Sequence, residues 1–173
     1  MRKPTSQAPG KSASRRDDAQ CPCGSGWTYE LCCGPLHRGE REAADPSELM
    51  RSRFAAFARG EVAYLWRTLH ADHDDRARPR AVVEAELARA CRSARYDRLR
   101  VIDAAHDASS GQVLFHAAVR VDGKDQSFVE LSDFLHDGTG WRYLCGVSRP
   151  APAGSPAARV GSIDAYWALV RER

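Results

Sequence analysis

The sequence lacks long hydrophobic runs, and its first residues lack an apolar signal core. No apolar stretch approaches the ~20 residues that a membrane-spanning helix requires, so we expect no membrane span. The basic start at residues 1–4 is followed by Ser, Gln, Pro and Gly, which argues against secretion. We therefore expect a cytoplasmic protein, in which thiols stay reduced and clustered cysteines bind metal more often than they form disulfides.

A basic excess is also missing from most of the chain. Residues 1–20 hold five basic and two acidic side chains, while residues 21–173 hold 21 of each sign, so the net charge of +3 belongs to the N-terminal segment. Nucleic-acid-binding domains usually carry their basic excess on the folded part, so we do not expect a nucleic-acid partner. Residues 1–20 have few large apolar side chains and are predicted to be a disordered basic tail, either an arm for an acidic partner or, more simply, a solvated leader.

What the sequence does contain is a dense cysteine cluster. The segment CPCGSGWTYELCCG at residues 21–34 holds four of the six cysteines: Cys21, Cys23, Cys32 and Cys33. Four thiolates at this spacing can surround one metal ion in a tetrahedron, without an open position for water or substrate, which is typical of structural zinc sites. Because so short a segment has no core of its own, metal binding must supply its folding free energy.

Three alternatives to a four-thiolate zinc site remain open. Iron occupies the same four-sulfur arrangement. A disulfide between the two cysteine pairs is the less expected alternative in a reducing compartment. His37 lies four residues after Cys33 and within reach of the metal, but we expect it to be a surface histidine in a loop at residues 35–39, because four thiols are already present.

Helices are expected first along the folded part of the chain. Residues 45–48 (Asp-Pro-Ser-Glu) are a strong helix start, and Gly60 is a natural end. The apolar face of this helix repeats at helical spacing through Met50, Phe54 and Phe57. Arg51, Arg53 and Arg59 are expected on or near its exposed polar side. Further helices are predicted at 61–70 and at 80–94, where Cys91 is a small core residue.

A charged, non-periodic segment at residues 71–78 separates the last two of these helices. It is predicted to be a loop, and it contains His73 beside Asp72, Asp74 and Asp75. Such residues can ligate a metal ion, but neighbours in an irregular segment do not converge on one point. We therefore do not expect a second metal site there.

From residue 97 the apolar period changes to two, which predicts β-strands. Strands are expected near residues 97–101, 113–121, 127–135 and 141–147. Turn sequences at 122–123 and 137–140 indicate successive hairpins, and hence an antiparallel sheet with one face packed on the preceding helices. The expected class is therefore α+β, with about three helices covering the sheet.

The C-terminal region begins with a segment rich in Pro and Ala. Residues 151–161 are predicted to be a linker, and Ser162 to cap a final helix at residues 162–173. The apolar face of that helix comprises Ile163, Tyr166, Trp167 and Val170. We expect this face to dock on the chain's own domain rather than on a partner.

Several of these segments resemble known bacterial proteins. The run from Cys21 to Gly34 is similar to the SEC-C motif, the zinc-binding tail of the SecA preprotein-translocase ATPase. The blocks Leu49–Phe57 (LMRSRFAAF), Ser132–Phe134 and Trp141–Tyr143 resemble the YchJ family, and the match covers about residues 21–150. The resemblance implies a SEC-C element at 21–39 with the four cysteines as ligands. It also implies a domain at 40–150 similar to nuclear transport factor two, with a curved, cystatin-like sheet.

The same resemblance suggests partners, with two departures. For SecA-type motifs it implies contact with the SecB chaperone or the ribosome. Many SEC-C motifs have lysines where this chain has Trp27 and Thr28, so a basic binding face is missing here. Some relatives carry a second cysteine motif at the C-terminus, where this chain has residues 151–173 instead, so bridging by two metal modules is not expected.

Two classes of function follow from these observations. The first is a zinc-binding protein-interaction module linked to chaperone, ribosome or secretion machinery. The alternative is a small-ligand binder, or an enzyme similar to dehydratases and isomerases, because domains of this resemblance often enclose a conical pocket. The residues expected to point into such a pocket are Tyr64, His70, Glu130, Asp133 and Tyr143. Each is more simply a structural hydrogen-bond partner, so we assign no catalytic residue.

Overall fold

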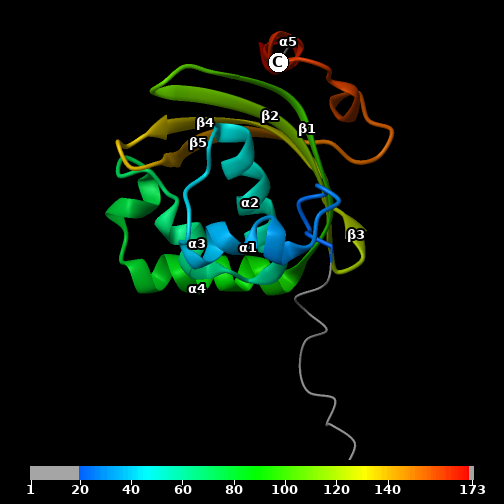
Figure 1. Ribbon diagram of the computed structural model, residues 1–173. Helices are drawn as coiled ribbons and strands as arrows, with labels where there is room; N and C mark the ends of the chain where they lie inside the picture. The colour runs from blue at the N-terminus through cyan, green and yellow to red at the C-terminus, as the bar shows by residue number, and fades with distance from the viewer. Residues whose placement is uncertain (1–19, 172–173) are drawn as a thin grey trace, which may run out of the picture.

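A curved antiparallel sheet forms the frame of the structure, a computed structural model that describes residues 20–171. The helices are α1 (Gly34–Arg38), α2 (Pro46–Arg59), α3 (Val62–Arg67), α4 (Arg80–Ser93) and α5 (Ile163–Arg171). The strands are β1 (Ala94–His106), β2 (Ser110–Val121), β3 (Lys124–Asp125), β4 (Phe128–His136) and β5 (Trp141–Pro150). Helices α1 to α4 lie on the concave side of the sheet and α5 on the convex side (Figure 1). The predicted α+β class is confirmed, whereas the predicted tail lies outside the described residues apart from Gln20.

The sheet bends because its strands are long and interrupted by bulges. The strand order is β1-β2-β4-β5, and the short β3 pairs with β2. Pairing of β1 with β2 shifts register at Tyr96/Arg98 and again at Val101/Asp103. A further shift opposite Asp133/Phe134 leaves Leu144 of β5 outside the pairing with β4. Bulges of this kind increase the local twist, so the sheet curls around the helices on its concave face.

Helix α2 forms as its sequence predicts and lies inside this curve. The Asp45 carboxylate accepts a 2.8 Å hydrogen bond from the backbone N–H of Glu48, and Pro46 occupies the first turn. Gly60 ends the helix with a left-handed φ of 78°. The apolar face of α2 packs into a core with the sheet that includes Leu49, Phe54, Phe115, Phe134 and Trp141.

A second apolar cluster covers the convex face of the sheet, so both faces are buried rather than the one predicted. It joins Leu114 and Leu131 from the strands to Tyr166 of α5. The Tyr166 side chain is completely buried, and its hydroxyl donates a 2.6 Å hydrogen bond to the carbonyl oxygen of Val147. The prediction that the final helix docks on its own domain is confirmed.

The segment at 151–161, predicted to be a linker, belongs to this convex cluster. Ala151, Ala157 and Val160 are buried in it. His116 donates a 2.9 Å hydrogen bond from Nε2 to the carbonyl oxygen of Ala151, which holds the segment on β2. The low side-chain volume of Ala lets this segment lie flat on the sheet.

Local predictions differ from the structure in three further places. Residues 35–39 were expected to be a loop, but Pro35 lies in the first turn of the short helix α1, and Gly39, with φ 75°, ends it. The segment 71–78 contains one turn of 3-10 helix at Asp74–Ala77. Helix α3 ends at Arg67, before the predicted boundary at residue 70. Among the helices of residues 20–171, none is long and apolar enough to cross a membrane.

Candidate metal centre and pocket

The N-terminal segment at residues 21–39, hereafter the knuckle, folds back on itself so that its cysteines meet. The backbone N–H of Cys21 donates a 2.8 Å hydrogen bond to the carbonyl oxygen of Trp27, which closes the first loop. This tight loop requires left-handed backbone at Gly24 and Gly26, whose φ angles are 78° and 84°. One turn of 3-10 helix at Tyr29–Leu31 then returns the chain to the second cysteine pair.

The four knuckle sulfurs form a compact group with the dimensions of a metal site. All four Sγ atoms lie within 4.8 Å of one another. The Sγ of Cys32 is 3.5 Å from that of Cys23 and 3.8 Å from that of Cys33. Sulfurs at about 2.3 Å from a tetrahedral zinc ion are about 3.8 Å apart, whereas a disulfide needs about 2.05 Å. The donor set and its spacing therefore fit a four-thiolate metal ion.

Electrostatics also favour a cation at the centre of this group. The hydrogen bond with Cys23 raises the pKa of Cys21 to about 12, and hydrogen bonds with Cys21 and Cys23 raise the pKa of Cys33. The same contacts lower the pKa of Cys23, so its thiolate is stabilised by neighbouring thiols. Four thiolates at this distance repel one another unless a divalent cation lies between them. The Ser25 hydroxyl, 3.2 Å from the Sγ of Cys32, is placed to donate to one of the bound thiolates.

His37 is not the surface loop histidine that the sequence predicted. It is buried in α1, its Nε2 donates to the carbonyl oxygen of Ser52 at 2.9 Å, and its Nδ1 accepts from the Tyr29 hydroxyl at 2.9 Å. Both ring nitrogens are therefore engaged away from the sulfurs. His37 is outside the four-sulfur group, and it connects the knuckle to α2.

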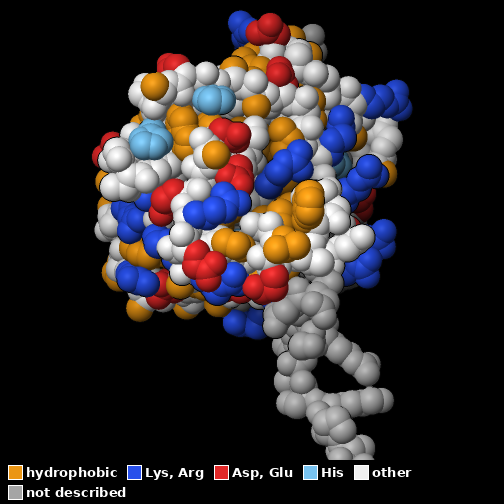
Figure 2. Space-filling model, viewed as in Figure 1, with side chains coloured by type: hydrophobic (Ala, Val, Ile, Leu, Met, Phe, Trp, Pro, Cys, Tyr) orange, Lys and Arg blue, Asp and Glu red, His pale blue; other side chains and the backbone are white. Residues whose placement is uncertain are grey.

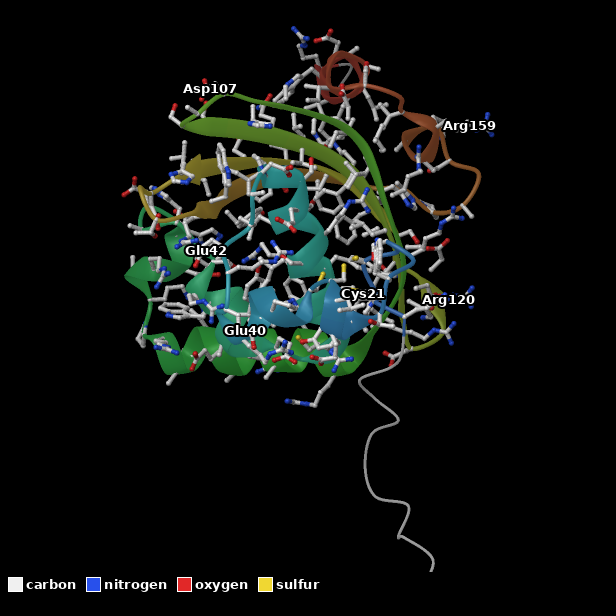
Figure 3. The ribbon with its side chains drawn as sticks, viewed as in Figure 1. Cys21, Glu40, Glu42, Asp107, Arg120 and Arg159 are labelled. Atoms are coloured by element: carbon white, nitrogen blue, oxygen red, sulfur yellow. The ribbon has the colours of Figure 1, made fainter. Side chains whose placement is uncertain are left out.

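The knuckle packs one of its sides against α2. Ala55 of α2 is buried in the cluster formed by Cys21, Cys23, Cys33 and Tyr29. The guanidinium of Arg59 lies 3.5 Å above the Tyr29 ring, although Arg59 was predicted to be exposed. Burial, together with the nearby Glu61 carboxylate, raises the pKa of Tyr29 to about 12. Figure 3 shows the sulfur atoms gathered near Cys21.

Two large apolar side chains of the knuckle are exposed to solvent. Trp27 is 64% exposed and Leu31 is 72% exposed, although Tyr29 between them is buried. Figure 2 shows hydrophobic atoms at the surface in the region of the knuckle. Aromatic side chains such as Trp27 are enriched at protein interfaces.

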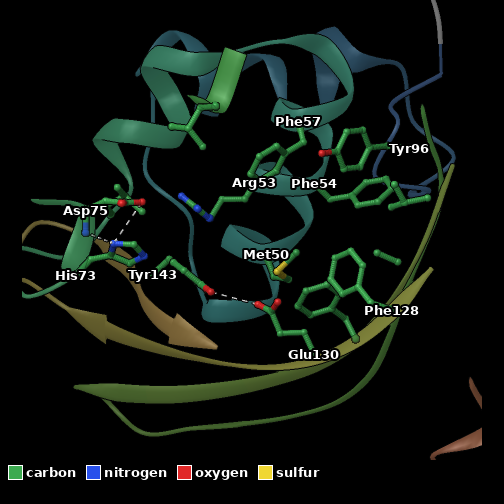
Figure 4. A pocket seen from close by; sticks show the side chains of 15 residues that line it. Met50, Arg53, Phe54, Phe57, His73, Asp75, Tyr96, Phe128, Glu130 and Tyr143 are labelled. Carbon is green, nitrogen blue, oxygen red and sulfur yellow. Dashed lines mark hydrogen bonds and ion pairs between the residues drawn. The ribbon is translucent and has the colours of Figure 1, made fainter. Parts of the chain in front are cut away.

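A separate cavity of about 300 Å³ lies between α2, α4 and the concave face of the sheet (Figure 4). Its apolar wall includes Met50, Phe54, Phe57, Tyr96 and Phe128. Its polar lining comprises Arg53, His73, Asp75, Glu130 and Tyr143. The α+β domain therefore has a cavity on the concave side of its sheet.

Glu130 and Tyr143 line this cavity, but the other three predicted pocket residues do not. The Tyr64 hydroxyl is buried 2.6 Å from the Ser52 Oγ, and His70 Nδ1 accepts from the backbone N–H of Asp72. Asp133 accepts a 2.7 Å hydrogen bond from the Gln112 amide. Tyr64, His70 and Asp133 thus hold parts of the fold outside the cavity.

Three further residues line the cavity although the sequence did not predict them there: Arg53, His73 and Asp75. Arg53 is 6% exposed, contrary to its predicted place on the polar side of α2. A signal was present, because Arg53 lies three residues after Met50 and four before Phe57, within the apolar stripe. His73 accepts from the backbone N–H of Asp75 at 3.0 Å, and burial lowers its pKa.

Metal-type side chains come together only at the cysteines within residues 20–171. His73 and the three aspartates beside it do not form a second such group in that range. Asp75 is instead paired with Arg78 at 2.7 Å.

Comparisons with known proteins agree with both parts of this structure. The family model described as "YchJ, middle NTF2-like domain" matches residues 45–146. A UPF0225 protein from Deinococcus radiodurans is 39% identical over 125 residues, which cover 72% of this chain and 85% of that protein. A SEC-C motif containing protein from Rhodopseudomonas palustris, solved in solution, is 35% identical with a TM-score of 0.64, covering 73% of this chain and 96% of that one.

A crystal structure of a SEC-C motif containing protein from Psychrobacter arcticus shares the fold. Its TM-score is 0.62 at 21% identity, covering 81% of this chain and 86% of that one. The cysteine cluster is thus compatible with metal binding in both geometry and motif. Since the family model spans more than half of the sequence and the Deinococcus relative extends the match, the chain belongs to the YchJ family.

Proposed function

We propose that this protein is a zinc-binding protein-interaction module whose metal site shapes the knuckle for a partner. The observation that carries the proposal is the position of Trp27 and Leu31, which are exposed on the same short segment whose four sulfurs converge. The knuckle has a centre of four sulfurs, packs on Ala55 of α2, and exposes Trp27 and Leu31 to solvent.

Zinc is the proposed metal because four thiolates fill a tetrahedron and leave no position for a reacting group. Such a site stabilises structure instead of performing chemistry. Iron at the same sulfurs is the competing assignment, and metal analysis of the purified protein separates the two. A reducing compartment such as the cytoplasm keeps the four thiols available for the metal.

The proposed partner is a protein, with the SecB-type chaperone as the first candidate and the ribosome as the second. Contact through Trp27 and Leu31 depends on burial of apolar area, so its affinity should vary little with salt. Binding to the ribosome through its RNA would instead need positive charge and would weaken steeply with salt. The missing lysines at positions 27 and 28 weigh against binding to ribosomal RNA, and the exposed Trp27 and Leu31 support contact with a protein surface.

The test is direct binding of the purified zinc-loaded protein to purified chaperone and to ribosomes at two salt concentrations. The double variant Trp27→Ser/Leu31→Ser should bind the chaperone roughly 30-fold more weakly, as expected for loss of about 2 kcal/mol at an interface centre. Val82→Ser is the matched control, because Val82 is 47% exposed on α4, away from the knuckle.

If the double variant binds the chaperone as tightly as the wild-type protein does, the proposal is contradicted. Salt-sensitive binding to ribosomes alone would contradict the choice of partner. Zinc content is measured on the same samples, and each variant should contain as much zinc as the wild-type protein.

A further inference from the structure

The cavity on the concave face contains one buried cation, the guanidinium of Arg53, and within residues 20–171 only one of its three nitrogens makes hydrogen bonds. Arg53 Nη1 donates to the carbonyl oxygen of Leu65 at 3.0 Å and to the Oγ1 of Thr68 at 2.6 Å. Among the described residues, no hydrogen-bond acceptor meets its Nε or Nη2, and the Glu130 carboxylate acts on it only through space, without an ion-pair contact. In Figure 4 the guanidinium points into the space beside Tyr143, whose ring centre is 4.7 Å from its Cζ.

A buried arginine of this kind is costly unless an anion joins it. Removing a guanidinium from water has a penalty that hydrogen bonds to neutral groups offset only in part. Burial accordingly lowers the pKa of Arg53. The planar guanidinium offers paired N–H donors that match a carboxylate, so the free Nε and Nη2 favour an anion of that shape.

Glu130 supplies a second polar group to the same cavity. Its Oε1 accepts from the Ser132 hydroxyl at 2.7 Å and from the Tyr143 hydroxyl at 3.2 Å, the bond drawn in Figure 4. Within residues 20–171 its Oε2 has no hydrogen-bond donor, and no Lys or Arg pairs with the carboxylate. Glu130 can therefore accept a hydrogen bond from a ligand and would repel a doubly charged anion such as a phosphate monoester.

The remaining wall of the cavity is apolar and mostly aromatic. The rings of Phe57 and Tyr96 stack at 5.6 Å, and the ring of Phe54 meets Tyr96 edge-on at 5.7 Å. Phe57, Tyr96 and Phe128 are only half-buried, so the aromatic wall is reached from solvent. A volume of about 300 Å³ is at the small end of ligand pockets and suits a single ring or a branched chain.

We propose that this cavity binds a small organic monocarboxylic acid that has an apolar, ring-sized body and a hydroxyl or amino donor. The carboxylate pairs with Arg53, the donor hydrogen-bonds to Glu130, and the body contacts Phe54, Phe57 and Phe128. This site is distinct from the metal knuckle, and its occupancy does not depend on a partner protein.

The first experiment titrates the zinc-loaded full chain with four matched probes, followed by calorimetry and by NMR. Phenyllactate has the carboxylate, the hydroxyl donor and the apolar ring. Phenylpropionate lacks the hydroxyl, phenyllactamide lacks the negative charge, and lactate lacks the ring. Phenyllactate should bind at least tenfold more tightly than each of the other three and should shift the Arg53 Nε–H signal. Equal affinity for the acid and the amide, or no binding of any probe at millimolar concentration, overturns the proposal.

The second experiment uses protein variants. It includes changes at Glu130 and Phe128, so the proposal can still be tested if the Arg53 variant fails to fold. Arg53→Gln should abolish binding of every acid, while the exposed Arg120→Gln, at 59% side-chain exposure, should change nothing. Glu130→Met, which has no acceptor oxygen, should remove the advantage of phenyllactate over phenylpropionate and leave phenylpropionate affinity unchanged or improved. If Glu130→Met weakens both acids equally, or if Phe128→Ala has no effect on affinity, the assignment of this cavity is wrong.

Discussion

Tyr29 of the knuckle donates its hydroxyl hydrogen to Nδ1 of His37 across 2.9 Å, in a buried position. His37 in turn donates from Nε2 to the carbonyl oxygen of Ser52 in α2. This pair therefore joins the metal centre to the helix that also carries Arg53 of the cavity. Because the Ser52 carbonyl oxygen can only accept, neutral His37 carries its hydrogen on Nε2, and its Nδ1 is left to accept from Tyr29.

Removing the Tyr29 hydroxyl should weaken this joint. Tyr29→Phe leaves the buried Nδ1 of His37 without a donor, which should lower the free energy of unfolding by about 1–3 kcal/mol. Urea unfolding of the zinc-loaded protein measures the change. Zinc content should stay at the wild-type value, because the hydroxyl is not a ligand, and a variant as stable as wild type would contradict the role assigned to this bond.

His37 should make stability depend on pH. Burial lowers its pKa below the ordinary value of 6.5, so the unfolded chain binds more protons than the folded chain as pH falls below 6.5. The stabilisation from neutral His37 is complete above pH 6.5 and declines as pH falls from 6.5 toward the depressed folded pKa. The free energy of unfolding of His37→Gln, subtracted from that of wild type at each pH, should show this decline, and a difference independent of pH would contradict it.

Close packing at Gly111 should not tolerate a methyl group. A Cβ there would lie 2.5 Å from Cγ of Pro46 and 2.7 Å from Cβ of His106, so Gly111→Ala should cost about 1–3 kcal/mol. Gly161→Ala is the matched control, because a Cβ at that position meets no described atom within 4 Å and its φ is not left-handed. Thermal unfolding of both variants tests the difference, and equal melting temperatures would refute it.

The C-terminal helix should contribute to the stability of the sheet. Tyr166→Ala removes a completely buried ring from the convex cluster, so it should cost about 3–5 kcal/mol. Tyr166→Phe removes only the hydrogen bond to Val147 and should cost about 1 kcal/mol. Both should retain wild-type zinc content. Equal stability of Tyr166→Ala and wild type would mean that α5 leaves the sheet in solution.

Features that depend only on neighbouring residues in the sequence were predicted correctly. The cap at Asp45, the left-handed glycine at 60 and the clustering of the four cysteines follow from neighbouring residues, and each appears in the structure. The convex layer was missed in part because the low-volume residues of 151–161 resemble a linker, and only tertiary contacts show that Ala151 and Val160 are buried.

Pocket residues required knowledge of which way each strand faces. Glu130 and Asp133 are three positions apart on β4, so they point to opposite faces, and only one of them can line the cavity. On β5 the unpaired Leu144 reverses the alternation after Tyr143, so the regular pattern predicted for residues 141–147 does not continue through Cys145. Bulge positions are set by pairing between distant strands, which a single sequence does not display.

The metal content of the purified protein is the most direct test of the proposed four-thiolate zinc site. Wild type and Cys145→Ser, which alters an exposed cysteine outside the cluster, should each contain one zinc ion per chain. Cys32→Ser should lose most of its zinc and melt at a lower temperature, because three thiolates and a hydroxyl hold the ion less tightly than four thiolates. Unchanged zinc stoichiometry in Cys32→Ser, or a wild-type protein that is stably folded and binds no zinc, would contradict the account.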